Sequence, residues 1–231
     1  MRTEINTEWG VKMSNFLKSI LEENGFQTEY IDSEALLVKD FFSKDELDQV
    51  FEVINSTPNE EWFIEYHANL KHFCMQKFGR NDVDNLVAEG KFEITQNWQD
   101  KNLNIGKYPF QRVLYDRLND LIQKVDTTIE LSGFATIQRM QEGVELKAHT
   151  DQDTDPSIRY AAILYLNDDY VDGELFFLKD GVNLRPQPGS LLIFPGNAEY
   201  NHGVRHVGPG PIRYVLVGFI KEKGFYQKNR Y

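Results

Sequence analysis

The sequence has few of the features that mark secreted or membrane-spanning proteins. Cys74 is the only cysteine among 231 residues, so no internal disulfide can form and a reducing, cytoplasmic location is expected. The longest apolar runs, near residues 161–166 and 214–220, fall far short of the roughly 20 residues that span a bilayer. The sequence starts without the apolar segment of a secretory signal. We therefore expect no membrane partner.

Basic residues are also scarce. The chain has 25 Lys and Arg against 36 Asp and Glu, which gives a net charge of −11, and no local basic patch stands out. Such a surface repels nucleic-acid phosphates, so no nucleic-acid partner is expected. Hydrophobic residues make up 41% and charged residues 26% of the chain, as in globular proteins that bury a core. The absence of a linker predicts a single domain over 1–231.

Helical patterns dominate the first half of the chain. Apolar residues at helical spacing, including Phe16, precede Gly25 and predict a helix over 14–24. A short strand is expected over 35–38, and Ser43 with Glu46 forms a capping-box pattern that opens a helix to about residue 55. A longer apolar stripe follows Pro109 and consists of Phe110, Val113, Leu114, Leu118, Leu121, Ile122 and Val125. Between these helices, the polar residues 76–108 predict a loop region that grips substrate.

Strand patterns dominate the second half. The expected strands cover residues 133–140, 144–151, 159–166, 174–178, 182–186, 190–194, 202–207 and 212–220, separated by turn-forming clusters. Eight strands in one run are typical of a double-stranded β-helix, or jelly roll. The predicted fold class is α+β and mainly β, with N-terminal helices packed on one sheet. Residues 1–132 would form helical support and a substrate loop region, and 133–220 the jelly-roll core.

Three residues of the second half suit a metal site. His149 and Asp151 are two positions apart at the end of a predicted strand, so their side chains would point to the same face. His202, at the start of a later predicted strand, can supply a third ligand. Two histidines and one carboxylate leave positions open on an octahedral ion, as in non-haem Fe(II) oxygenases.

A cation lies downstream of this triad in the sequence. Fe(II), one protein carboxylate and a dianionic keto-acid together carry a net negative charge, which a buried cation would balance. Arg213 follows His202 across a tight turn and can bind a carboxylate through two hydrogen bonds. Tyr165, on the strand face of Ala161 and Ile163, can donate to the same carboxylate or can be an ordinary core tyrosine.

Five motifs in order carry a family resemblance. They are His149-Thr150-Asp151, Tyr165-Leu166-Asn167-Asp168, Gly173-Glu174-Leu175-Phe176-Phe177, the segment 188–195, and His202-Gly203-Val204 through Arg213-Tyr214. Over 133–220 the chain resembles the Fe(II)- and 2-oxoglutarate-dependent dioxygenases, in particular the prolyl 4-hydroxylase-like branch. The resemblance implies iron held by His149, Asp151 and His202, and 2-oxoglutarate held by Arg213 and Tyr165.

The resemblance also implies an activity. With O2, and with ascorbate as an expected reductant, 2-oxoglutarate would be converted to succinate and CO2 while a substrate C–H bond is hydroxylated. A prolyl residue in a peptide or protein is the favoured substrate. A free amino acid or another small molecule is the alternative substrate, and a catalytically inactive jelly-roll binding module is the alternative function. Oligomeric state is not predicted.

The chain departs from the family pattern at three places. Arg139-Met140-Gln141 occupies a position where the family often has tyrosine, so one usual contact to the co-substrate is missing or replaced. His206 replaces a common proline, and one extra residue precedes Arg213. These changes concern the geometry around the co-substrate rather than the triad.

Other residues offer alternatives at each position. His206 is a second choice for the third ligand, Asp153 for the carboxylate, and Arg159 and Arg185 for the cation. His67, His72 and Cys74 lack the spacing of a zinc site and are expected to be core or surface residues. Trp62 and Trp98 flank the polar stretch and either pack in the core or line a substrate groove.

Overall fold

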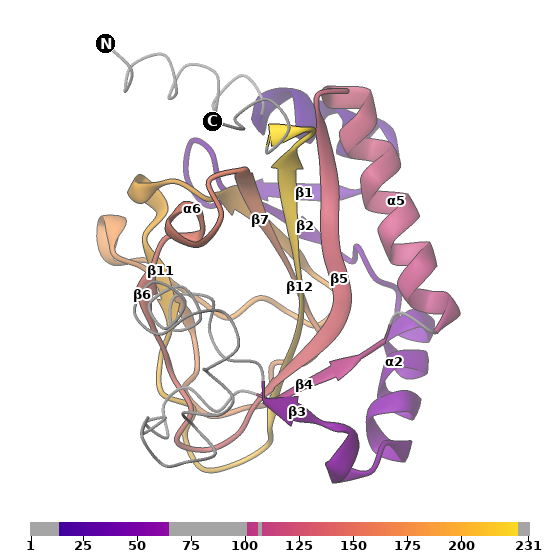
Figure 1. Ribbon diagram of the computed structural model, residues 1–231, viewed down its shortest axis with the longest axis vertical. Helices are drawn as coiled ribbons and strands as arrows, with labels where there is room; N and C mark the ends of the chain where they lie inside the picture. Colours follow the sequence, from indigo (N-terminus) through magenta and orange to yellow (C-terminus); the bar gives the residue numbers. More distant parts are fainter. Residues whose placement is uncertain (1–13, 65–100, 106–107, 226–231) are drawn as a thin grey trace.

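The computed structural model describes residues 14–64, 101–105 and 108–225 and shows two antiparallel sheets that face one another (Figure 1). The major sheet has the order β1-β2-β10-β7-β12-β5-β4-β3. In that order its strands are Gln27–Tyr30, Leu36–Lys39, Leu191–Pro195, Ile158–Tyr165, Arg213–Glu222, Ile129–Met140, Lys101–Asn104 and Phe63–Ile64. The minor sheet has the order β6-β11-β8-β9, with strands Leu146–His149, His202–Val204, Leu175–Phe177 and Asn183–Leu184.

The helices cover the outer face of the major sheet. Residues 14–23 are helical, and the main helices are α2 (Lys44–Ser56) and α5 (Pro109–Val125). Figure 1 shows α2 and α5 along the same flank of the molecule. The buried residues of α5 are Phe110, Leu114, Leu118, Leu121 and Ile122, and they share one apolar core with Leu216 and Ile220 of β12. The predicted fold class, with helices packed on one sheet, is confirmed.

The three predicted helices are confirmed, with corrections at single positions. Ser43 accepts a hydrogen bond from the Glu46 amide, and the Glu46 side chain accepts one from the Ser43 amide, which completes the capping box of α2. Phe16 and Val113, expected in the buried stripes, are 50% and 49% exposed. Both lie beside the stripe rather than on it, because the face that meets the sheet is set by residues such as Leu17 and Leu114.

The first half of the chain contains more strand than its sequence pattern predicts. The expected strand over 35–38 is β2, but β1, β3 and β4 were not predicted. β4 lies inside the stretch expected to be a loop, because it pairs with the edge of β5 and buries Leu103. Short polar strands of this kind owe their structure to the neighbouring strand rather than to their own pattern. Of the rest of the expected substrate loop, residues 76–100 and 106–107 lie outside the described residues.

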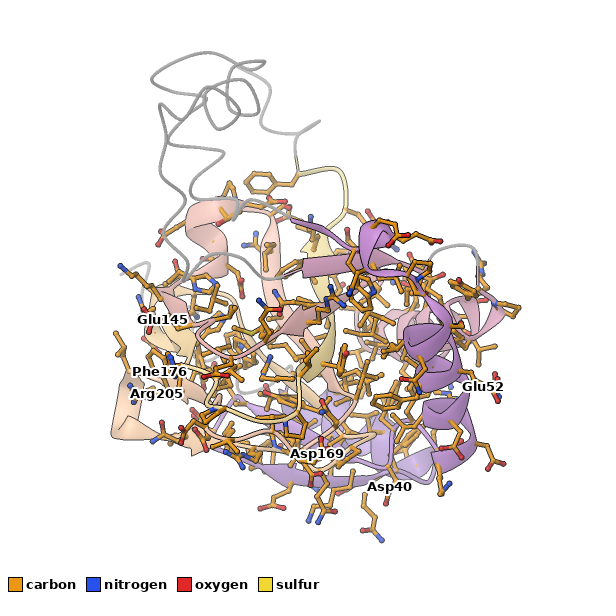
Figure 2. The ribbon with its side chains drawn as sticks, turned by 90° about the horizontal axis from the view of Figure 1, so that it is seen from below. Asp40, Glu52, Glu145, Asp169, Phe176 and Arg205 are labelled. Carbon is orange, nitrogen blue, oxygen red and sulfur yellow. The ribbon has the colours of Figure 1, made fainter. Side chains whose placement is uncertain are left out.

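A second apolar core fills the space between the sheets. Its members include Ala161, Ile163 and Tyr165 of β7, Phe194 of β10, Val215 of β12, and Leu175 and Phe177 of β8. Phe176 points to the opposite face of the minor sheet, where the Arg205 guanidinium lies 4.1 Å from its ring centroid (Figure 2). The minor sheet is therefore apolar toward the interior and is covered outside by a cationic side chain.

All eight strand segments expected after residue 133 are present, with different bounds. The strands expected over 182–186 and 202–207 are shortened to β9 and β11. The strand expected over 144–151 ends at His149, and Asp151 begins the one-turn helix α6 (Asp151–Thr154). The turn residues were therefore easier to locate than the strand ends. No helix in the described ranges is long and apolar enough to cross a membrane.

Candidate metal centre

The two histidines are direct neighbours across the minor sheet. His202 begins β11 and is the cross-strand partner of His149, the last residue of β6. Between this pair and the next, Val204 with Leu146, the register shifts by one residue. Such a bulge re-aims the side chains beside it. The result is two imidazole rings whose centroids lie 4.6 Å apart.

Asp151 reaches the histidines from α6 and not from a strand. The expectation that Asp151 shares a strand face with His149 is wrong, because the chain turns into helix after Thr150. The turn is held by a hydrogen bond from the Gln152 amide to the Gly196 carbonyl, 3.0 Å long. A Cβ at Gly196 would lie 3.3 Å from Asp151 Cβ and 2.8 Å from a methyl of Ile158, so glycine allows this approach.

Both imidazoles are oriented by backbone carbonyls. His149 Nδ1 lies 2.9 Å from the Lys147 oxygen, and His202 Nδ1 lies 3.0 Å from the Tyr200 oxygen. A carbonyl can only accept, so Nδ1 is the protonated nitrogen in each ring and Nε2 carries the lone pair. Metal-binding histidines commonly use this arrangement to fix the ring and its tautomer.

Burial keeps the two histidines neutral and opposes the charge of the aspartate. Burial lowers the pKa of His202 to about 4, against the smaller effect of its hydrogen bond to Tyr200. Burial, followed by the neighbouring His202, also lowers the pKa of His149. Burial raises the pKa of Asp151 to about 6, while His149 opposes the rise. Neutral imidazoles beside a carboxylate short of partners form a site that a cation would stabilise.

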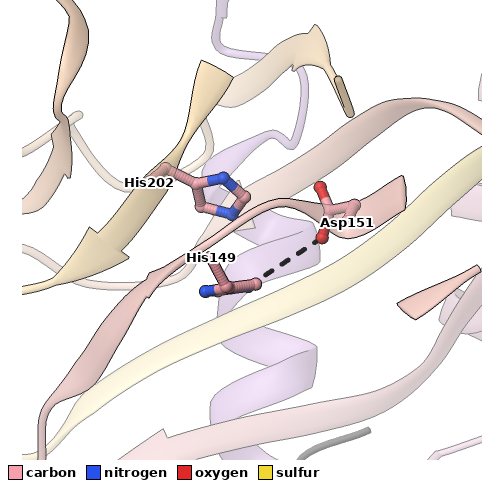
Figure 3. A group of neighbouring side chains, drawn as sticks. All are labelled: His149, Asp151 and His202. Carbon is pink, nitrogen blue, oxygen red and sulfur yellow. Dashed lines mark ion pairs between the residues drawn. The ribbon is translucent and has the colours of Figure 1, made fainter. Parts of the chain in front are cut away.

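His149, Asp151 and His202 point toward one another (Figure 3). Their ligand atoms all lie within 4.8 Å of one another, and His149 Nε2 is 4.0 Å from Asp151 Oδ1. The other oxygen, Asp151 Oδ2, is buried and has no hydrogen-bond partner in the described chain. One oxygen and two imidazole nitrogens with open positions form the donor set of non-haem Fe(II) sites, so the residues fit iron.

The alternative ligands lie outside this group. His206 follows the end of β11 and is exposed, and Asp153 is exposed on α6. Neither belongs to the cluster of metal-ligating groups found in the described ranges. His67, His72, Cys74 and Trp98 lie outside the described residues, so their expected roles are not tested.

Arg213 and Tyr165 lie together on the major sheet. Arg213 begins β12, and Tyr165 ends the adjacent strand β7, where it pairs with Val215. Their exposed fractions are 1% and 0%. The Arg213 Cζ lies 5.5 Å from the Tyr165 ring centroid. Arg213 Nε and the Tyr165 hydroxyl are buried without a hydrogen-bond partner in the described ranges. Unused donors around a buried cation fit a carboxylate such as that of 2-oxoglutarate.

Arg139 and Met140, which occupy a position where the family often has tyrosine, lie on opposite faces of β5. Met140 is the cross-strand partner of Arg213, and its Sδ lies 3.5 Å from Arg213 Nη1. The Arg139 guanidinium lies 4.2 Å from the ring centroid of Trp62, which is 5% exposed in the core beneath the helices. Met140 therefore borders Arg213, whereas Arg139 and Trp62 belong to the outer layer.

The alternative cations already have anionic partners. Arg159 pairs with Glu222, and Arg185 pairs with Glu174 and donates to two backbone carbonyls. Arg213 differs because it has no carboxylate partner in the described chain. A buried guanidinium without an anion is unusual, since an unpaired buried charge is strongly destabilising.

Sequence reasoning missed one buried residue beside Arg213. Tyr170 lies in the turn after β7 and is 1% exposed, and its ring centroid is 5.7 Å from the Arg213 Cζ. The only signal in the sequence is a large aromatic residue within a polar turn, and turn residues are usually exposed. The orienting carbonyls of Lys147 and Tyr200 were also missed, because backbone groups leave no mark in a residue pattern.

Comparisons with known proteins agree with this geometry. Residues 135–221 match the model of the 2OG-Fe(II) oxygenase superfamily. A prolyl hydroxylase from Trichoplax adhaerens, solved with a peptide fragment of the hypoxia inducible factor oxygen degradation domain, is 14% identical with a TM-score of 0.63. The match covers 97% of this chain and 96% of that one.

Two further solved structures are similar. A Pseudomonas putida prolyl-4-hydroxylase is 18% identical with a TM-score of 0.51, and the match covers 90% of this chain and 100% of that one. The viral collagen prolyl hydroxylase of Paramecium Bursaria Chlorella virus-1, in its 2OG complex, is 12% identical with a TM-score of 0.53, covering 81% and 96%. No curated protein sequence matches significantly.

The structural neighbours establish the fold, and the matched segment contains the whole His149, Asp151 and His202 group together with Arg213 and Tyr165. Residues 135–221, which carry this group, are therefore similar to the 2OG-Fe(II) oxygenase superfamily, and the chain has the jelly-roll fold that the prolyl hydroxylase structures share.

Proposed function

We propose that this protein hydroxylates a C–H bond of a prolyl residue in a peptide or protein, and converts 2-oxoglutarate to succinate and CO2 in the same reaction. His149, Asp151 and His202 hold Fe(II), and Arg213 with Tyr165 holds the far carboxylate of 2-oxoglutarate. The observation that carries the proposal is the convergence of the three ligand groups within 4.8 Å of one another, with Asp151 and His202 buried. In this superfamily the bound iron supplies the oxidising chemistry.

The protein groups have separate tasks at this site. The carbonyls of Lys147 and Tyr200 fix both imidazoles with Nε2 available for the metal. Asp151 supplies the negative charge that holds a divalent cation more firmly than three neutral ligands would. Arg213 and Tyr165 fix the far carboxylate of 2-oxoglutarate, so that its 2-oxo acid end is held toward the metal ligands.

The wall behind His202 is aromatic and excludes water. The Phe194 ring lies 4.7 Å from the His202 ring, and the Phe177 ring lies 6.2 Å from it. Both phenylalanines are at most 4% exposed. An apolar surround strengthens the electrostatic contacts inside the site and protects reactive species from solvent.

In the proposed enzyme, the two halves of the chain form a single domain. Residues 133–220 carry the site, and the described part of residues 1–132 supports the major sheet through β1, β2, β4 and the helices. The substrate class is supported by the structural neighbours, one of which is bound to a peptide. The net charge of −11 further favours a neutral or basic peptide over an acidic one.

Succinate formation tests the activity. Purified protein is incubated with Fe(II), 2-oxoglutarate, ascorbate, oxygen and a library of proline-containing peptides, and succinate and peptide mass are measured. We expect wild-type protein to form succinate and to add one oxygen atom to a prolyl residue. Asp151→Ala removes the only carboxylate of the triad and should lower succinate formation by about 100-fold or more.

Asp153→Ala is the matched control, because Asp153 lies on the same helical turn but points into solvent. It should retain wild-type activity. Equal succinate release from wild type and Asp151→Ala would contradict the proposal. If oxygen is added only to free amino acids or other small molecules, the proposed iron site stands but the proposed peptide substrate is wrong.

A further inference from the structure

Tyr170 is a buried polar residue that the proposed site does not use. It is among the largest side chains with less than 2% exposure, together with Arg213 and Tyr165. Its hydroxyl has no hydrogen-bond partner in the described part of the chain. A buried hydroxyl without a partner is destabilising, so a group of this kind calls for a partner that completes it, such as a bound ligand.

The Tyr170 ring is packed directly against Arg213. A Cβ built at Gly173 would lie 3.3 Å from Tyr170 Cδ2 and 3.5 Å from Arg213 Cδ, so both side chains meet at this glycine. The two tyrosine rings flank one guanidinium, with centroids 5.5 Å and 5.7 Å from Arg213 Cζ. Tyr165 comes from the end of β7 and Tyr170 from the turn that follows it.

Tyr170 is held in this place from its other side. Arg185 Nη1 donates to the Tyr170 carbonyl at 3.0 Å, and the Arg185 guanidinium lies 5.0 Å from the Tyr170 ring centroid. Arg185 is itself anchored by Glu174 and by the Asp172 carbonyl. The ring therefore has a fixed position, which a residue that binds a ligand precisely needs.

Three donors near one point have no acceptor. Arg213 Nε and the Tyr165 and Tyr170 hydroxyls are buried and donate to no acceptor in the described ranges, and Arg213 Nη1 contacts the weak acceptor Met140 Sδ. Burial raises the pKa of both tyrosines, against the charge of Arg213 and its side-chain contact with each hydroxyl oxygen, so the hydroxyls stay protonated and able to donate at neutral pH. One carboxylate has lone pairs for all three donors.

We infer that Tyr170 is a third binding residue for the far carboxylate of 2-oxoglutarate, and that its hydroxyl donates to that carboxylate beside Arg213 and Tyr165. This inference rests on the proposed function. It makes Tyr170 a specificity residue, which favours a dicarboxylate co-substrate over 2-oxo acids that end in a methyl group.

Ligand affinity in the absence of turnover tests the inference. The full chain is loaded with Mn(II) without oxygen, and the dissociation constants of 2-oxoglutarate and 2-oxopentanoate are measured by calorimetry. 2-Oxopentanoate keeps the metal-binding end but has a methyl group in place of the far carboxylate. Tyr170→Phe removes only the hydroxyl and should weaken 2-oxoglutarate about tenfold, while 2-oxopentanoate changes less than about twofold.

Tyr115→Phe is the matched control. Tyr115 donates to the Leu131 carbonyl beneath α5, away from Arg213, so its loss should leave both dissociation constants unchanged. An unchanged affinity of Tyr170→Phe for 2-oxoglutarate would overturn the inference and leave the proposed function intact. Equal weakening of both ligands would also overturn it, because it would show a purely structural role. Failure of the wild type to bind 2-oxoglutarate would instead overturn the proposed function itself.

Discussion

Asp32 links the N-terminal segment to the residues that precede His202. Asp32 Oδ1 accepts hydrogen bonds from the Tyr200 hydroxyl at 2.7 Å and from the amides of Glu34 and Ala35. The Tyr200 carbonyl in turn orients the His202 ring. The Asp32 carboxylate therefore fixes Tyr200, and the Tyr200 carbonyl orients His202, a candidate metal ligand.

This linkage predicts a pH-dependent stability. Burial alone would raise the pKa of Asp32, but hydrogen bonds from Tyr200 and the two amides outweigh burial and lower it. A lowered pKa means that the ionised form stabilises the fold above about pH 4, and that this stabilisation is lost as the pH falls through the folded-state value. Asp32→Asn should lower the free energy of unfolding by about 1–2 kcal/mol at pH 7, and the difference should shrink below pH 4.

Urea unfolding at a series of pH values measures this effect. Asp48→Asn is the control, because Asp48 forms an exposed ion pair with Lys44 on α2 and should change stability little at any pH. A constant difference between wild type and Asp32→Asn from pH 7 to pH 3.5 would show that the Asp32 charge does not stabilise the fold.

At the level of elements, the close approach of β11 and β6 brings His149 and His202 together. A Cβ at Gly203 would lie 2.4 Å from the Leu146 carbonyl oxygen and 2.7 Å from Phe176 Cζ. The contact with Leu146 cannot be relieved by a side-chain movement, because the oxygen belongs to the backbone. Any residue larger than glycine would therefore push β11 away from β6.

Gly203→Ala should weaken metal binding because it moves His202 away from His149. We expect at least about a tenfold loss of Mn(II) affinity and a lower melting temperature. Gly143→Ala is the control for backbone effects: Gly143 has φ +88° with nothing within 4 Å of a Cβ, so alanine there costs about 1 kcal/mol without a clash. Unchanged Mn(II) affinity in Gly203→Ala would refute this role of the strand pair.

At the level of elements, the sequence predicted what depends on local pattern. The capping box of α2 and the Pro109 start of α5 are present because caps and apolar periodicity act within a few residues. The strand β4 was missed because its pairing with β5 depends on residues distant in the sequence. The end of β6 was misplaced because α6 begins where Gln152 bonds to Gly196, a contact that no local pattern records.

At the level of the whole molecule, the residues of the site could be chosen from the sequence but their arrangement could not. Spacing and chemistry selected His149, Asp151 and His202, and the structure brings these three together. The register that pairs His202 with His149, and the bulge beside it, arise from the meeting of distant strands. Tyr170 was missed for the same reason, since its contact with Arg213 crosses from a turn to another strand.

Metal binding by the intact protein is the most direct test of the iron site formed by His149, Asp151 and His202. Mn(II) is titrated into metal-free wild type, His202→Ala and His206→Ala, and the bound ion is counted by electron paramagnetic resonance. We expect one ion per chain in wild type, a loss of affinity of about 100-fold or more in His202→Ala, and wild-type affinity in His206→Ala. Wild-type affinity in His202→Ala, with loss in His206→Ala, would contradict this site.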